Sequence, residues 1–297
     1  MGNWWSWKKN CIRNNIMEIR EIEAKSILVK SGLPNSDWVI NPYVGCQFGC
    51  KYCYAAFMGR WKHPDRDWGD FLDVKINAPE ILKRDLERLE KKYGKKDFGS
   101  IFFSSVTDPY GPAETKYQLT RRCLEVLADF KYEGEVSILT KSPLVTRDID
   151  VLKRLKSEVG LTITTIEDKV AKFLESFAPS PTARIKTLQR LHELGIPIYA
   201  FVGPLLPYFA ARKGKLEKLF QELKSVGVKR IYIEHINLSS RIRERLYKYL
   251  KAYNPRLIFY FKKAEAKKYR ENLEKIIYPI VEREKLEIIG GEILCHE

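Results

Sequence analysis

The feature that most constrains the fold is a repeated alternation of short β-rich runs and longer helical runs from about residue 70 onward. Strands are predicted over residues 71–76, 100–106, 135–140, 161–166, 198–202 and 230–236. Helices are predicted over residues 79–93, 114–130, 146–157, 169–177, 181–194, 215–225 and 241–253. Strands that alternate with helices pair in parallel through helical crossovers. About six such units predict an α/β fold, a partial (β/α)6 TIM-like barrel.

The two ends of the chain differ from this central part. Residues 1–16 are rich in Trp and Asn and lack periodicity, whereas Met17 opens a regular segment. We hypothesise that residues 1–16 are a flexible N-terminal extension and that Met17 is the true start. The barrel is then predicted over residues 17–255, and residues 256–297 are predicted to form a small C-terminal extension packed on it.

The charge balance favours polyanionic partners. The chain contains 53 Lys and Arg against 38 Asp and Glu, a formal net charge of +15, which promotes encounters with nucleic acid. Abundant Lys and Glu with only three Met are also typical of proteins from hot environments. The charge alone leaves both interpretations open.

No segment is predicted to cross a membrane. The most apolar stretch, residues 198–211, is interrupted by Gly203, Pro204 and Pro207 and is shorter than the roughly 20 residues that a span requires. The N-terminus has no apolar secretory signal. The sequence therefore predicts a cytoplasmic protein without a membrane partner, in which six cysteines indicate metal, cluster or redox chemistry rather than disulfides.

Three of the cysteines form a compact motif. Cys46, Cys50 and Cys53 have C-x3-C-x2-C spacing and follow an apolar stretch that begins at residue 38. Gly45 and Gly49 let the backbone wrap tightly, so that three thiolates can converge from one loop. Three protein ligands leave one coordination position open, as a catalytic metal requires.

Two other interpretations of this motif stay open. A structural zinc site would need completion by His63, or by Cys295 and His296, and a plain electron carrier would use the same thiols. Zinc motifs normally contain paired cysteines, whereas Cys11, Cys123 and Cys295 are isolated. Cys123 lies in an apolar helical pattern that is typical of a core residue.

The motif, with Tyr52 before its third cysteine, is similar to the signature of radical S-adenosylmethionine (SAM) enzymes. The resemblance implies that the three cysteines hold a [4Fe–4S] cluster whose fourth iron binds the amino and carboxylate groups of SAM. Reductive cleavage of SAM, with an electron from a donor such as ferredoxin or flavodoxin, then gives a 5′-deoxyadenosyl radical that abstracts hydrogen from a substrate. The resemblance also implies a full or partial (β/α) barrel with a small C-terminal extension.

Within that superfamily, the chain resembles the spore photoproduct lyase-related branch. The stretches that carry this resemblance are NPYVGCQFGCKYCYA (41–55), SSVTDPYGPAE (104–114), LTKSPLVTRDID (139–150) and SPTARIKTLQRLHELGIP (180–197). In spore photoproduct lyase, a cysteine in the loop after the second strand returns hydrogen to the product radical. The corresponding loop here has Ser104 and Ser105 and no cysteine. A hydroxyl is a far poorer hydrogen-atom donor than a thiol, which argues against thymine-dimer repair itself. Tyr110 or Tyr54 is the alternative donor.

The resemblance assigns polar residues at the strand ends to SAM. Tyr52 is expected near the adenine, and the segment containing Asp108 stands where many relatives carry a Gly-Gly-Glu type motif that binds the SAM amine. Arg184 is a candidate for the SAM carboxylate, because a guanidinium matches a carboxylate bidentately. The alternative for Arg184 is an arginine on a helix surface. The alternative for the Asp108 segment is a simple turn. Thr165 is expected to hold ribose hydroxyls with its neighbours Thr164 and Glu167. The predicted cofactor-binding residues are Tyr52, Ser104, Ser105, Thr107, Asp108, Ser142, Thr165 and Arg184.

Three residues are predicted to be catalytic. They are Tyr110, Lys141 and His235. Lys141 is suited to a carboxylate or a substrate phosphate, and His235 ends the sixth predicted strand, at the barrel mouth. A solvated lysine and a structural histidine are the alternatives.

Together these observations predict a radical SAM enzyme with an unidentified substrate, for which DNA or RNA is the favoured class, in repair or modification. No further cysteine group indicates a second cluster. The alternative is a non-catalytic zinc- or iron–sulfur-bearing nucleic-acid-binding protein, which would need no SAM pocket.

Overall fold

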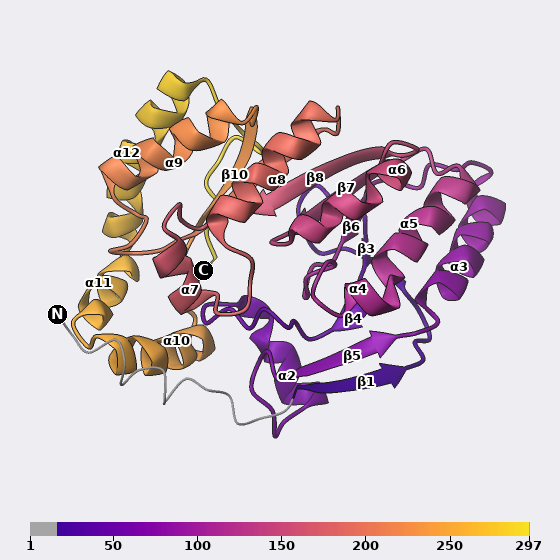
Figure 1. The fold of residues 1–297 in the computed structure, drawn as a ribbon, viewed down its shortest axis with the longest axis horizontal. Helices are drawn as coiled ribbons and strands as arrows, with labels where there is room; N and C mark the ends of the chain where they lie inside the picture. The colour runs from indigo at the N-terminus through magenta and orange to yellow at the C-terminus, as the bar shows by residue number, and fades with distance from the viewer. Residues whose placement is uncertain (1–16, 297) are drawn as a thin grey trace.

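The computed structural model describes residues 17–296, so the predicted extension over residues 1–16 lies outside the described part. Its main element is a curved eight-stranded sheet with the order β11-β10-β9-β8-β7-β6-β3-β2 (Figure 1). All neighbouring strands are parallel except β2, which runs antiparallel to β3. The strands are β2 (Leu28–Lys30), β3 (Trp38–Ile40), β6 (Ile101–Phe103), β7 (Glu135–Thr140), β8 (Lys156–Thr162), β9 (Ile198–Leu205), β10 (Arg230–His235) and β11 (Glu287–Ile288). Six α/β units on an open sheet confirm the predicted partial barrel.

Helices cover the outer face of this sheet (Figure 1). They are α3 (Ala78–Tyr93), α5 (Leu119–Phe130), α8 (Pro181–Glu193), α9 (Lys213–Ser225) and α12 (Lys267–Glu284). Alternate strand residues such as Val159 and Leu161 pack against them in one continuous core, which also contains Cys123. Cys123 is fully buried, as the apolar pattern predicts. The inner face of the sheet and the C-terminal ends of its strands are not covered by these helices, and an active site is expected there.

The first barrel strand differs from the prediction. Residues 71–76 do form a strand, β5 (Phe71–Lys75), but it pairs with β1 (Glu18–Ile22) and β4 (Tyr43–Val44) in a separate three-stranded sheet. The first strand of the barrel is β3, which pairs with β6. All three residues of β3 are buried, so it lacks the alternation that marks a longer strand.

The connection between the third and fourth barrel strands also differs from the prediction. The predicted helix over residues 146–157 is replaced by a 3-10 segment (Pro143–Asp148) and the short α6 (Ile149–Leu152), and β8 begins five residues before the predicted start. Strand β8 pairs with β7 from Lys156 to Leu161, because Val159 and Leu161 face the core. The predicted helix over residues 114–130 is interrupted at Gln118, which has a φ of +50° and separates α4 (Glu114–Tyr117) from α5.

The C-terminal segment returns to the open edge of the barrel. After α10 (Ser240–Tyr253) and α11 (Leu257–Ala264), α12 contacts α9. The chain then pairs with β10 through backbone hydrogen bonds from Leu294 to Ile233 and from His235 to Leu294. Figure 1 shows α11 and α12 on the same side of the barrel as α9 and β10, and α7 spans Asp168–Leu174. The predicted boundary at residue 255 stays a prediction. No helix among the described residues has the length and apolarity needed to cross a bilayer.

Candidate active site

The cysteine motif forms a loop between β4 and the short 3-10 turn Tyr54–Ala56. Backbone hydrogen bonds from Gly49 to Cys46 and from Cys53 to Cys50, both 3.2 Å, fold it into two successive turns. Burial raises the pKa of all three thiols, that of Cys50 to about 12, and neighbouring motif cysteines contribute to the rise at Cys46 and Cys50. A metal must therefore stabilise the thiolates.

The residues around this loop fit an iron–sulfur cluster. The three cysteines pack in an apolar cluster that includes Phe48, Leu174 and Leu206, and such shielding from water is one of the protein's means of tuning a cluster. Within residues 17–296, no three His, Cys, Asp or Glu side chains are grouped to hold a single metal ion. Each thiolate of a [4Fe–4S] cluster binds a different iron, so the three thiols need not converge on one point.

The ligands required by the zinc alternative have other partners. His63 lies 2.9 Å from Asp73 and stacks on Phe71. His296 lies 2.8 Å from Glu234. Neither histidine completes a closed site with the motif cysteines.

Arg245 of α10, which the sequence analysis missed, supports the cysteine loop. Its Nη1 donates to the carbonyl oxygens of Cys50 at 2.6 Å and Lys51 at 3.0 Å, and its Nη2 donates to those of Gly49 at 3.5 Å and Trp68 at 3.3 Å. Burial lowers the pKa of Arg245. One guanidinium thus holds the backbone of the loop. In a helix with several Lys and Arg, no sequence signal distinguishes it.

Tyr52 is fixed by a second residue that the sequence analysis missed. Its hydroxyl donates to Glu175 Oε1, which also accepts from Thr164 Oγ1 at 3.1 Å. Burial alone would raise the pKa of Glu175, but the charges of Arg184 and Lys141 lower it below its usual value. Glu175 is therefore an ionised anchor for Tyr52. It follows α7 and belongs to none of the motifs.

Arg184 binds Glu175 from the opposite side. Its Nη2 donates to Glu175 Oε2 at 2.5 Å, and both side chains are completely buried. Its Nε donates to the carbonyl of Pro179 at 2.8 Å and its Nη1 to that of Thr162 at 3.0 Å. Every nitrogen of the guanidinium has a protein partner. This arrangement favours a positioning role, and the predicted contact with the SAM carboxylate stays a prediction.

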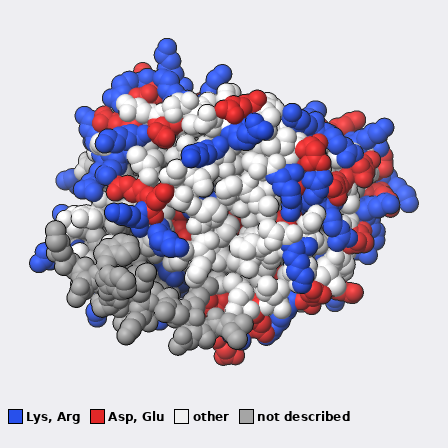
Figure 2. Space-filling model, viewed as in Figure 1, with Lys and Arg blue, Asp and Glu red and all other residues white. Residues whose placement is uncertain are grey.

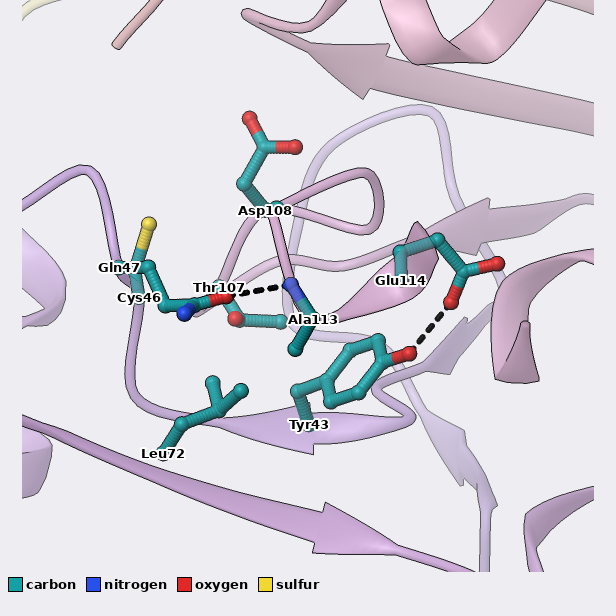
Figure 3. Close-up of a pocket in the computed structure, with 9 residues that line it drawn as sticks. Tyr43, Cys46, Gln47, Leu72, Thr107, Asp108, Ala113 and Glu114 are labelled. Atoms are coloured by element: carbon teal, nitrogen blue, oxygen red, sulfur yellow. Dashed lines mark hydrogen bonds between the residues drawn. The ribbon is translucent and has the colours of Figure 1, made fainter. Parts of the chain in front are cut away.

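Asp108 lies next to Cys46 and is bound to the end of β7. Its Oδ1 accepts from Thr140 Oγ1 at 2.6 Å and from the Tyr110 amide at 2.9 Å, and its Oδ2 accepts from the Lys141 amide at 2.9 Å. Burial raises its pKa, although these hydrogen bonds oppose the shift. Figure 3 shows the Asp108 carboxylate and the Cys46 thiol projecting to the same side of a small pocket.

Lys141 places a cation beside the motif. Its Nζ lies 5.9 Å from the centre of the Tyr52 ring. Burial acts to lower its pKa, but the negative charges of Cys50 and Glu175 raise it above its usual value. Lys141 therefore remains protonated and is available for a ligand carboxylate or phosphate.

The hydroxyls of the predicted SAM segment follow β6. Thr107 Oγ1 donates to the carbonyl of Gly45, and Ser105 Oγ accepts from Asn41 Nδ2 at 3.3 Å. Ser104 has a φ of +70°, a conformation that non-glycine residues rarely adopt. Its buried hydroxyl has no hydrogen-bond partner within the described part of the chain. The segment is thus held against the cysteine loop.

Two predicted catalytic residues do not join this group. Tyr110 is only 1% exposed, and its hydroxyl lies in the core, where burial and the nearby carboxylates of Asp148 and Glu114 raise its pKa. His235 Nε2 lies 2.9 Å from Glu274 of α12, so its ring faces the outer helical layer. Strand alternation explains this, because it directs odd-numbered residues of β10 outward.

Ser142 and Thr165 have local partners. Ser142 Oγ accepts from the Leu144 amide at 3.3 Å, and Thr165 Oγ1 accepts from the Glu167 amide at 3.1 Å. Both hydroxyls therefore stabilise the turns that follow β7 and β8. Their predicted roles in SAM binding stay predictions.

Replacing Gly45 with Ala should disrupt the cysteine loop. Gly45 has a φ of +94°, and a Cβ there would lie 2.5 Å from the carbonyl oxygen of Phe71. The left-handed conformation alone costs about 1–2 kcal/mol for an L-residue, so Gly45→Ala should lower both the free energy of unfolding and the iron content after reconstitution. Gly32→Ala is the control, because its Cβ would meet no atom within 4 Å. Equal iron contents in the two variants would contradict the expectation.

Glu175→Gln should destabilise the protein. Removing one charge from a buried ion pair costs about 3 kcal/mol or more, and the Glu175–Arg184 pair is completely buried. Chemical denaturation measures the loss. Because the pKa of Glu175 is lowered in the folded protein, its charge contributes fully to the free energy of unfolding above the usual pKa of a glutamate. That contribution is lost as the pH falls through the lowered pKa. Glu167→Gln, which breaks a partly exposed pair with Lys215, is the control and should cost less than about 1 kcal/mol.

Comparisons with known proteins agree with this geometry. Residues 40–209 match the family described as the Radical SAM superfamily. An uncharacterized protein of Methanocaldococcus jannaschii is 42% identical over 65% of this chain and 70% of its own length. An uncharacterized protein of Acidianus two-tailed virus is 31% identical, over 67% of each chain.

Solved structures share the fold. Spore photoproduct lyase complexed with dinucleoside spore photoproduct superposes with a TM-score of 0.71, covers 91% of this chain and 81% of that chain, and is 14% identical. At this identity the likeness establishes the fold. The predicted superfamily and the likeness to spore photoproduct lyase are both confirmed.

Proposed function

Because this chain belongs to the radical SAM superfamily, we propose that it uses a 5′-deoxyadenosyl radical to abstract hydrogen from a nucleic acid, with DNA as the favoured form. Membership makes the chain an enzyme with a [4Fe–4S] cluster and SAM as cofactors. This sets aside the non-catalytic alternative. The observation that carries the proposal is the buried three-cysteine loop with its adjoining ligands.

We assign the cluster to Cys46, Cys50 and Cys53. When bound, the reduced cluster supplies the electron that cleaves SAM. Tyr52, held by Glu175, presents its ring beside this position, and we assign it to the adenine. Lys141 supplies a positive charge for the SAM carboxylate or a substrate phosphate.

We assign Asp108 and the segment before it to SAM recognition. The two oxygens of Asp108 are oriented by hydrogen bonds from the Tyr110 amide and from Thr140 and Lys141 at the end of β7, so little reorganisation is needed when a ligand amine approaches. The buried hydroxyl of Ser104 without a partner supports the same assignment, because buried polar groups normally have one. A low-potential donor such as ferredoxin or flavodoxin is the proposed reductant.

Two observations support a nucleic-acid substrate. The chain has a net charge of +15, and the fold is similar to that of spore photoproduct lyase, which has been solved with a dinucleoside spore photoproduct. In Figure 2, Lys and Arg are interspersed with Asp and Glu around the edge of the face shown, and uncharged residues fill its middle. The overall charge therefore favours the substrate class without locating its binding site.

The chemistry on the substrate is proposed to differ from that of spore photoproduct lyase. The loop after β6 carries Ser104 and Ser105 where a thiol is expected for hydrogen return. Tyr54 lies at this loop, and its hydroxyl donates to the Ser105 carbonyl. We therefore propose a DNA modification or a repair reaction with a different hydrogen donor.

Isotope transfer tests this proposal. The reconstituted enzyme is incubated anaerobically with SAM, dithionite and DNA that is deuterated at its carbon-bound positions. We expect deuterium in the 5′-deoxyadenosine product, because the radical takes its hydrogen from the substrate. Undeuterated 5′-deoxyadenosine from DNA in every strand form and from RNA would contradict a nucleic-acid substrate, although SAM cleavage itself would stand.

A further inference from the structure

A row of aromatic side chains is exposed beside the barrel mouth. Tyr208 is 38% exposed, Phe259 57% and Tyr260 40%. The Tyr208 and Tyr260 rings lie 4.8 Å apart, and those of Phe259 and Tyr260 lie 5.5 Å apart. We call these three residues the aromatic surface. Adjacent exposed rings of this kind are unusual, because large apolar side chains normally become buried.

Cations lie at both ends of the aromatic surface. The Arg212 guanidinium lies 4.9 Å from the centre of the Tyr208 ring, and Lys263 Nζ lies 4.4 Å from that of Phe259. Lys262 is exposed next to them. The surface therefore combines ring faces with positive charge.

The surrounding segment is strongly basic. Residues 251–270 contain seven Lys and Arg and a single acidic residue, Glu265. The Glu265 carboxylate binds Arg243 at 2.8 Å and the Tyr247 hydroxyl at 2.9 Å, so its charge is largely compensated. This local excess of positive charge exceeds that of the chain as a whole and complements a polyanion.

The aromatic surface is built on the apolar cluster that contains the cysteine loop. Tyr208 lies in the loop after β9, at the C-terminal end of the barrel, where active sites of this architecture lie. Its neighbour Phe209 and the α11 residue Phe261 are buried in the same apolar cluster as Cys50 and Tyr52. A ligand on this surface would therefore lie over the same apolar cluster that holds the cysteine loop.

We propose that the aromatic surface binds single-stranded DNA. Unpaired bases stack on Tyr208, Tyr260 and Phe259, while Arg212, Lys262 and Lys263 contact the phosphates. Protein sites for single strands combine stacking rings with a basic track in this way. A duplex keeps its base faces stacked inside, so the surface favours single strands. The inference rests on the proposed nucleic-acid substrate and adds where and in which form that substrate binds.

Fluorescence anisotropy of the full-length, cluster-loaded protein tests the inference. The probe is a labelled oligo-dT of about 12 nucleotides, which is within the usual size of such sites, and the same strand in a duplex serves for comparison. We expect tighter binding of the single strand, with an affinity that falls as salt rises. The Tyr208→Ala/Tyr260→Ala variant should bind the single strand at least tenfold more weakly, because two stacking rings are removed.

Tyr93→Ala provides a matched control. Tyr93 is 47% exposed and has Lys92 Nζ at 5.0 Å from its ring, but it lies on α3, which belongs to the opposite part of the barrel wall. The affinity of the Tyr93→Ala variant for oligo-dT should equal that of the wild type. Should the double tyrosine variant fail to fold, Lys262→Glu/Lys263→Glu changes only exposed side chains of α11 and should weaken binding by a similar factor.

Three results would overturn the inference. They are wild-type affinity for oligo-dT in both the aromatic and the lysine variants, equal or tighter binding of the duplex, and binding of oligo-rU but not of oligo-dT. The formation of 5′-deoxyadenosine without DNA is measured in parallel and should be unchanged in the Tyr93→Ala control. If that activity is absent from the wild type while stacking-dependent binding persists, the proposed catalytic function fails and the binding surface stands.

Discussion

Cys50→Ala should abolish the formation of 5′-deoxyadenosine. Cys50 is the middle cysteine of the motif, and the other described cysteines, Cys123 and Cys295, lie outside the loop, so no further thiol of the loop can replace it. Loss of an outer-shell partner typically costs roughly 10–100-fold in metal affinity or activity, and loss of a direct ligand should cost more. Chromatography of the reaction products and iron analysis measure the two effects.

Cys123→Ala is the matched control for this prediction. Cys123 is fully buried in the main core, on α5. The substitution should lower the stability of the protein but leave its iron content and SAM cleavage near the wild-type values. If Cys50→Ala retained SAM cleavage, or if Cys123→Ala lost its cluster while folded, the assignment of the cluster to the motif would be wrong.

Arg245→Ala should produce the second large effect. The guanidinium donates to carbonyls on both sides of Cys50, and hydrogen bonds to charged groups contribute about 1.5–3 kcal/mol each when their partners are otherwise left unsatisfied. We expect a lower midpoint of chemical unfolding and a several-fold lower iron content, because the loop loses its defined shape. Arg245→Lys should restore the iron content only in part, since an ammonium lacks the planar fork.

Arg243→Ala tests whether this effect is specific. Arg243 is on the same helix, but it pairs with Glu265 at the surface. Its substitution should change stability by less than about 1 kcal/mol and leave the iron content unchanged. If the two arginine variants load iron equally well, Arg245 does not support the loop in the way proposed.

The sequence predicted the parts of the site that depend on local spacing. The C-x3-C-x2-C motif lies within one loop, so Cys46, Cys50 and Cys53 could be identified without knowing the fold. Lys141 and Asp108 follow predicted strands, and the structure brings both to the cysteines. The alternation of strands and helices was sufficient for the fold class, because it extends over most of the chain.

The residues that were missed act from a distance in the sequence. Arg245 reaches the cysteine loop across 195 positions, and Glu175 reaches Tyr52 across 123. Neither belongs to a local pattern. The outward position of the His235 ring could not be predicted, because adjacent strand residues point to opposite faces and the sequence of β10 does not reveal which face bears the helices. Its catalytic role stays a prediction.

The central claim is that this chain cleaves SAM reductively with a cluster held by its three-cysteine loop. It is tested most directly by anaerobic reconstitution with iron and sulfide, addition of dithionite and SAM, and chromatography of the products. We predict about four irons per chain, as one [4Fe–4S] cluster requires, and formation of 5′-deoxyadenosine that depends on dithionite. Uptake of zinc without a cluster, or a fully loaded cluster that yields no 5′-deoxyadenosine with or without DNA, would contradict the account.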